Sequence, residues 1–148
     1  MDSFDAQLSS ELQRLRDETD SDLAAYAAPD TLLSRWRWRW AIGEFGTRLL
    51  RLAVQPGRGI VGAALRTGRT IVLDRHRNAS DLRREDIPLL LSERLSSVVA
   101  APVFAEGRAI GLILLGSRSG RSYDDATLQL LADTSARIAV AADSFRIP

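Results

Sequence analysis

The chain has 148 residues, 45% hydrophobic and 26% charged, with a formal net charge of +1, which suits one soluble globular domain over residues 1–148. The absence of cysteine excludes disulfides, thiol catalysis and thiolate metal sites, and the single His76 argues against a histidine-based metal cluster. The positive and negative charges are mixed along the chain, so we do not expect it to bind nucleic acid. No apolar run has the length of a membrane span, and no secretion signal opens the chain. We therefore expect a cytoplasmic protein that does not bind a membrane.

The sequence patterns predict, in chain order, a helix, two strands, a short helix, a strand, a loop, a second short helix, a strand hairpin and a long helix. The first helix is expected over 3–17, the two strands over 22–27 and 34–42, the first short helix over 57–68 and the next strand over 70–73. The loop covers 74–86, the second short helix 87–95, the strand hairpin 97–104 and 109–116, and the long helix 122–142. Gly68 suits the end of the first short helix, and Ser122 suits the start of the last one. This order predicts an α+β fold with an antiparallel sheet. The N- and C-terminal helices would cover one face, and the short helices and a ligand pocket would lie on the other.

The segment over 34–42 contains all three tryptophans, alternating with arginines. In a regular strand every second side chain points the same way, so Trp36, Trp38 and Trp40 are expected on one face. Such a wall of indoles could be ordinary core, because aromatic residues favour strands and dominate cores. It could equally form one side of a ligand pocket.

Both short helices have apolar starts, Gly59-Ile60-Val61 and Pro88-Leu89-Leu90, with no evident side-chain cap. The first turn of a helix carries free N–H groups and the positive end of the helix dipole. If both starts faced one apolar pocket, they could hold a weakly hydrated, singly charged, planar anion, with the Trp38 indole as a further donor. The alternative is that water or a carbonyl of the glycine turn satisfies these N–H groups.

Three segments carry a resemblance to a known family: 57–70, 99–104 and 111–116. With the order of elements, they resemble a GAF domain over nearly the whole chain. The segments 37–43, 57–62 and 87–89 are similar to the small nitrate-binding GAF regulators of the NreA type. Trp40 and Ile87 depart from that pattern, in which we expect tyrosine and an aromatic residue.

The resemblance implies a nitrate held by backbone N–H groups of the two short helices and by a tryptophan. Trp38 matches that tryptophan, and Ile60 and Leu89 match the residues that offer the backbone donors. The expected ligand-binding residues are Trp38, Trp40, Gly59, Ile60, Val61, Ile87, Pro88, Leu89 and Leu90. No cofactor or metal is expected.

No motif places a base beside a nucleophile, so we do not expect an enzyme. The predicted fold uses the whole chain, and a sensor without an output domain must report by contact. The resemblance implies a sensor histidine kinase of a two-component system as the partner. A homodimer through the terminal helices is also expected, with four residues covering each other: Phe4, Leu8, Leu12 and Leu15. Two alternatives stay open, namely a GAF interaction module with a filled pocket and a sensor of another small ligand.

Overall fold

A five-stranded antiparallel sheet with the strand order β2-β1-β5-β4-β3 forms the centre of this computed structural model, which describes residues 3–30, 32–44, 46–75, 83–119 and 123–144. The strands are β1 (Leu23–Asp30), β2 (Arg35–Ile42), β3 (Ile71–Asp74), β4 (Ser97–Ala105) and β5 (Arg108–Ser117). The helices are α1 (Ser3–Glu18), α2 (Gly46–Leu50), α3 (Gly59–Thr67), the 3₁₀ turn η2 (Arg84–Asp86), α4 (Ile87–Ser92) and α5 (Asp125–Ser144).

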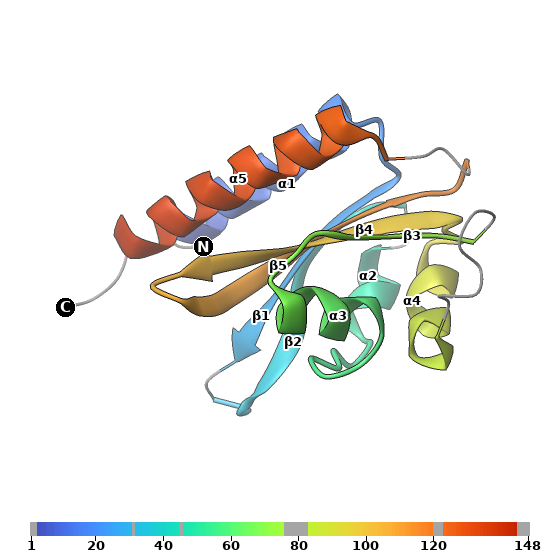
Figure 1. Ribbon diagram of the computed structural model, residues 1–148, viewed down its shortest axis with the longest axis horizontal. Coiled ribbons are helices and arrows are strands. Elements are labelled where there is room, and N and C mark those ends of the chain that lie inside the picture. The colour runs from blue at the N-terminus through green and yellow to red at the C-terminus, as the bar shows by residue number, and fades with distance from the viewer. Residues whose placement is uncertain (1–2, 31, 45, 76–82, 120–122, 145–148) are drawn as a thin grey trace.

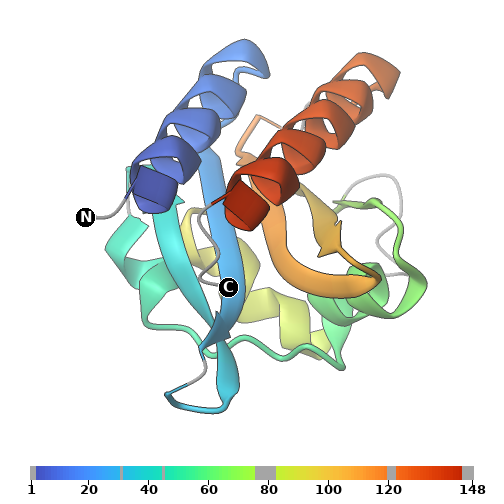
Figure 2. The same ribbon diagram turned by 90° about the vertical axis from the view of Figure 1, so that its left-hand side faces the viewer.

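The helices form two layers, one on each face of the sheet. Helices α1 and α5 lie side by side on one face, and α2, α3 and α4 lie on the other (Figure 1). The view at right angles shows α1 and α5 running alongside each other above the sheet (Figure 2). The predicted α+β class and the division of helices between the two faces are confirmed. Within the described residues, no helix combines the length and the apolar character needed to cross a bilayer.

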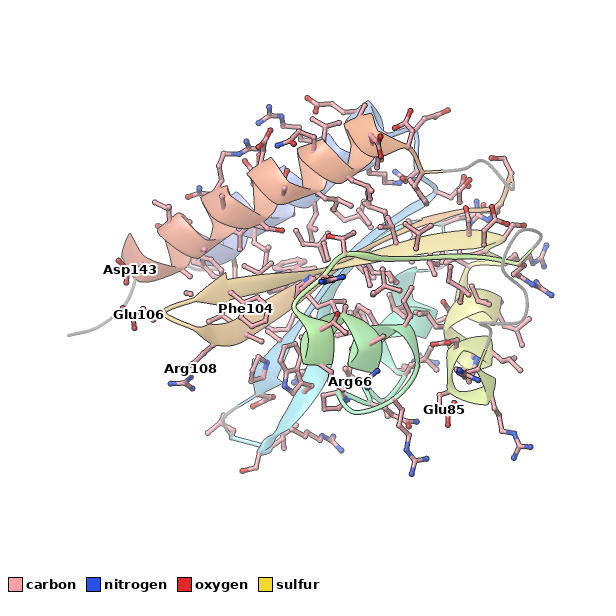
Figure 3. The ribbon with its side chains drawn as sticks, in the orientation of Figure 1. Arg66, Glu85, Phe104, Glu106, Arg108 and Asp143 are labelled. Carbon is pink, nitrogen blue, oxygen red and sulfur yellow. The ribbon has the colours of Figure 1, made fainter. Side chains whose placement is uncertain are left out.

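The two longest strands, β4 and β5, form the predicted hairpin at the centre of the sheet. Their connection uses Glu106 and Gly107, both at positive φ (54° and 76°). Two central residues of this kind match the twist of the flanking strands, and glycine adopts the second position without steric cost. The side chains of Glu106 and Arg108 project at the tip of the hairpin (Figure 3). The tip therefore lies at the end of the sheet, near Asp143 in the last turn of α5.

Leucines on α1 hold the outer layer against the sheet. Leu8, Leu12 and Leu15 are 2% exposed or less, and they pack with residues of β1, β5 and α5. Their i, i+4, i+7 spacing gives one apolar stripe, which the sheet of the same chain covers. The expectation that these leucines cover each other across a dimer is therefore wrong, since they are already buried within the chain.

The last helix begins later than the sequence predicted. Asp124 is its cap: its Oδ1 accepts the N–H of Thr127 at 2.9 Å and the Thr127 hydroxyl at 3.0 Å. A side-chain oxygen that accepts from the third helical N–H is the standard arrangement of an N-cap. Ser122, the predicted cap, lies outside the described residues. The predicted cap of α3 is confirmed, because Gly68 adopts the left-handed conformation and donates to the Ala64 carbonyl.

A β-bulge in β2 divides the three tryptophans between the two faces of the sheet. Trp38 and Trp40 are two positions apart, yet they lie opposite neighbouring residues of β1. Arg39 is thus an extra residue, and the side chains beyond it switch faces. Trp36 and Trp38 face the short helices, and Trp40 packs with the α1–α5 layer. The prediction of a single indole face is wrong, because it assumed a regular strand.

Candidate functional site

A hollow of about 210 Å³ lies between β2, α3 and α4, which we call the Trp38 hollow. Its lining includes four of the predicted site residues: Trp38, Val61, Pro88 and Leu89. Trp38 is 3% exposed and Leu89 is 7% exposed, so the hollow borders directly on the core. The strand and the two short helices that the sequence placed around a pocket therefore do meet at one place.

The remaining predicted residues lie elsewhere. Gly59 and Ile60 line a second, more open hollow of about 460 Å³ on the other side of α3, against β3. Trp40 faces the opposite layer because of the bulge. Leu90 is buried in the core, and Ile87 is 43% exposed and outside the lining of the Trp38 hollow. Placing Trp40 in the pocket was thus wrong, and α4 turns Ile87 and Leu90 away from the hollow.

The start of α3 is capped by a side chain that the sequence analysis missed. Asp86 is 4% exposed, and its Oδ1 accepts the N–H of Ile60 at 2.9 Å. The same residue lines both hollows. A carboxylate of the chain therefore occupies the amide that was predicted to serve an external anion. The expectation that the start of α3 has no side-chain cap is wrong.

Gly59 makes room for this cap. Its φ is +63°, a conformation that other residues adopt at a cost, and a Cβ there would overlap the Asp86 carboxylate. Any larger residue would move either the carboxylate or the start of α3. The glycine turn and Asp86 thus form one unit, although 26 positions separate Asp86 from Ile60.

A 3₁₀ turn precedes the second short helix, whose start was predicted to be bare. The turn η2 runs directly into α4: the Asp86 N–H donates to the Arg83 carbonyl at 3.0 Å, and the Ile87 N–H donates to the Arg84 carbonyl. Pro88 lies in the first turn of α4, where its missing N–H is tolerated. The turn moves the first free amides upstream of α4. The prediction of a bare helix end at Pro88 therefore needs this correction.

Charges of both signs surround the mouths of the two hollows. Arg58 and Glu85 line both, and their side chains approach to 4.0 Å. Arg66 and Arg83 line only the larger hollow. Figure 3 shows Glu85 pointing away from the sheet beside the start of α4. An incoming anion would thus meet cationic groups at the surface and the Asp86 carboxylate inside.

Comparison with known proteins identifies the family. The sequence model that describes the GAF domain matches residues 4–143. The chain belongs to the GAF domain family. GAF domains are generally regulatory modules that bind ligands, which agrees with a hollow bordered by a strand and two short helices. A search of curated proteins found no match.

Several solved structures are similar to this chain in shape. A mutated NreA protein from Staphylococcus aureus, altered in its nitrate binding site, is 29% identical, with a TM-score of 0.69 over 82% of this chain and 90% of that chain. A hypothetical protein from S. aureus is 30% identical, with a TM-score of 0.66 over 78% and 95%. A GAF domain/HD domain protein from Geobacter sulfurreducens, at 18% identity, has a TM-score of 0.77 over 96% and 93% and shows the shared fold alone.

Proposed function

We propose that this GAF domain senses a small, weakly hydrated anion such as nitrate in the Trp38 hollow and modulates a partner sensor histidine kinase. One observation carries the proposal: Trp38, the start of α3 and the start of α4 border one small hollow. A similar protein from S. aureus is described by its nitrate binding site, and it covers most of this chain at 29% identity.

The donors would come from the fold rather than from charged side chains. The α3 start supplies backbone N–H groups and the positive end of a nine-residue helix, and Trp38 supplies an indole N–H. A site of this kind favours a singly charged ion, because sulfate or phosphate would need more compensation than backbone amides supply. Very small ligands bind with at most about −1.5 kcal/mol per heavy atom, so a four-atom anion is limited to a dissociation constant of roughly tens of micromolar.

Asp86 couples anion binding to a change in the protein. Two negative charges about 4 Å apart repel each other by roughly 4 kcal/mol at the effective dielectric constant of a protein surface. An anion in the Trp38 hollow would therefore repel the Asp86 carboxylate, which lines the same hollow, and so weaken its hold on the Ile60 N–H. Since Asp86 lies at the junction of η2 and α4, the ligand state is passed to α4. This repulsion also weakens binding toward the millimolar range, which suits an abundant ion.

Thermal unfolding in sodium nitrate, against sodium chloride at equal ionic strength, tests the proposal. Nitrate at tenfold the dissociation constant should stabilise the folded chain by about 1.4 kcal/mol. Trp38→Phe, which removes the indole N–H of this lining residue, should reduce this gain. Trp40→Phe is the matched control on the opposite face and should leave it unchanged. Equal melting temperatures in nitrate and chloride would end the anion proposal.

A second function is favoured by the same Asp86 contact. If the carboxylate caps α3 permanently, the chain is a GAF interaction module without anion sensing. In that case nitrate has no effect on the wild-type chain or on Asp86→Asn, and Trp38→Phe changes stability alone. Titration with nitrite and small organic acids separates both readings from a sensor of another ligand.

A further inference from the structure

The outer surface of α4 is unusually apolar for a solvent-facing helix. Ile87 is 43% exposed and Leu91 is 61% exposed. They are four positions apart and therefore share one face of the helix. The opposite side of α4 carries Leu89, which lines the Trp38 hollow. A helix of six residues thus presents one apolar side to the hollow and another to solvent.

A further exposed leucine lies on helix α2, which is in contact with α4. The helix packs beside α4 at the same end of the molecule, on the face away from α1 and α5 (Figure 1). Its last residue, Leu50, is 40% exposed. The described residues include seven large apolar side chains that are at least 39% exposed, and three of them are Leu50, Ile87 and Leu91. Apolar side chains gathered on adjacent elements are typical of an interaction site, whereas single exposed ones are ordinary.

The charges beside this surface are mostly positive. Among the described residues, exposed arginines follow α2 and precede α4: Arg51, Arg83 and Arg84. Of the acidic residues near α4, Glu93 is fully buried and paired with Arg118, and Asp86 caps α3. Glu85 faces Arg58, and Glu44 near α2 lies 3.5 Å from Arg118. A partner with acidic side chains would find complementary charges here, whereas a second copy of this chain would bring the same arginines.

We propose that the exposed apolar side of α4, formed by Ile87 and Leu91, docks an acidic amphipathic helix of the partner protein, with Leu50 on the neighbouring helix α2 as a further apolar contact. Apolar side chains of the partner would cover this surface, and its flanking carboxylates would pair with arginines such as Arg84 and Arg51. The proposal rests on the proposed function for the identity of the partner as the protein that the sensor modulates. It adds the place of contact. Because α4 also borders the Trp38 hollow, one short element would carry the ligand state to the partner.

Two synthetic amphipathic helical peptides test this surface. They share one leucine stripe and differ in flanking residues, glutamate in one and lysine in the other, and binding is measured by fluorescence anisotropy. The glutamate peptide should bind the full chain at least about tenfold more tightly, equivalent to about 1.4 kcal/mol, and this preference should shrink as salt is added. Equal binding of both peptides, or binding of neither, would overturn the proposal.

Matched variants locate the contact. Leu91→Ser should weaken the binding of the glutamate peptide about tenfold. Leu32→Ser, which removes a leucine that is 94% exposed on the β1–β2 connection, should leave binding unchanged. Arg84→Glu should weaken the binding of the glutamate peptide and strengthen the binding of the lysine peptide. Equal losses from Leu91→Ser and Leu32→Ser, or no loss from either, would contradict this location.

Two further measurements separate the other outcomes. Sedimentation shows whether the wild-type chain self-associates; a dimer that Leu91→Ser dissociates and Leu32→Ser preserves would assign the surface to a second copy and overturn the acidic partner. Nitrate stabilisation of Leu91→Ser should equal that of the wild type, because Leu91 lies outside the hollow. The experiments can thus show a loss of peptide binding with nitrate stabilisation intact. They can also show peptide binding in a chain that nitrate does not stabilise.

Discussion

The Asp86 carboxylate accepts the Ile60 N–H at 2.9 Å, so the end of η2 caps the start of α3. Asp86 also lines the Trp38 hollow, so this contact links the start of α3 to the residue that precedes α4. Losing a cap of this kind costs roughly 1–3 kcal/mol. The contact is thus strong enough to hold the two helices together and weak enough for a nearby anion to disrupt.

Asp86→Asn should lower stability and raise nitrate affinity at the same time. The amide oxygen can still accept the Ile60 N–H, but the buried negative charge beside the anion is gone. We expect the free energy of unfolding to fall by about 1 kcal/mol and the nitrate dissociation constant to fall about tenfold or more. Calorimetric titration and urea unfolding measure the two effects. Glu85→Gln is the control, since that carboxylate lies at the exposed mouth; a weaker nitrate response in Asp86→Asn would show that the carboxylate does not repel the anion.

A second interaction ties the end of α4 to the sheet. Glu93 is fully buried, and its Oε1 lies 3.0 Å from an Arg118 guanidinium nitrogen. Arg118 also donates through Nε to the Glu93 carbonyl at 2.7 Å and through its backbone N–H to Asp22 at 2.7 Å. The ends of α4 and β5 and the residue before β1 therefore meet at one arginine.

Arg118→Met should destabilise the chain by about 3 kcal/mol, because it removes the guanidinium that pairs with the fully buried Glu93 carboxylate. Arg137→Met is the matched control: that arginine pairs with Glu11 at 3.0 Å between α5 and α1, and its side chain is 40% exposed. Partly exposed pairs contribute about 1 kcal/mol or less. Urea unfolding of both variants makes the comparison, and equal losses would show that the Glu93 pair has no special weight.

Local patterns were sufficient for the elements with strong periodicity or clear turn residues. The leucine spacing of α1 and the Glu106-Gly107 turn both predicted what the structure has. Helix α2 was missed, because a five-residue helix such as Gly46–Leu50 has too few positions to show a period. The bulge at Arg39 was missed for a related reason: an extra residue is defined by pairing with another strand, which the alternating sequence does not reveal.

The candidate site also has a part that the sequence predicted and a part that it did not. The meeting of Trp38, Val61 and Leu89 around one hollow followed from the resemblance to GAF domains and the order of elements. The Asp86 cap has no local signal, because the carboxylate reaches an amide 26 positions away. In sequence it looked like the end of a polar loop. Contacts of this kind depend on tertiary structure, and here one of them engages the Ile60 N–H, which the resemblance had assigned to the ligand.

Gly111 is required by the ring of Tyr26 on the neighbouring strand. A Cβ at Gly111 would overlap the Tyr26 ring and its hydroxyl, and Tyr26 is 2% exposed, so the ring has little room to move. Gly111→Ala should therefore cost about 1–3 kcal/mol through overpacking. In a Tyr26→Ala background the same substitution should cost much less, and unfolding of the four chains of this cycle gives the coupling. Additive losses would place the strain elsewhere.

Stability should fall in alkaline solution because of Tyr26. Burial raises the pKa of Tyr26 from 10.0 to about 12, since the ionised phenolate would lose its hydration inside the protein. The unfolded chain therefore releases this proton first, and the free energy of unfolding falls as the pH rises from about 10 toward 12. A shift of about two units corresponds to a loss of roughly 2–3 kcal/mol, complete above the pKa of the folded state.

The composition allows the ionisation of Tyr26 to be distinguished from that of other side chains. The chain has no lysine and no cysteine, and its only other tyrosine is Tyr123, so few side chains titrate in this range. Tyr26→Phe keeps the buried ring and removes the ionisable hydroxyl, whose hydrogen bond to the Ile110 carbonyl is long at 3.4 Å. Urea unfolding at several pH values should show the wild-type chain losing stability between pH 10 and 12 and Tyr26→Phe losing about 2–3 kcal/mol less. Parallel curves for the two chains would mean that Tyr26 ionises equally in the folded and unfolded states.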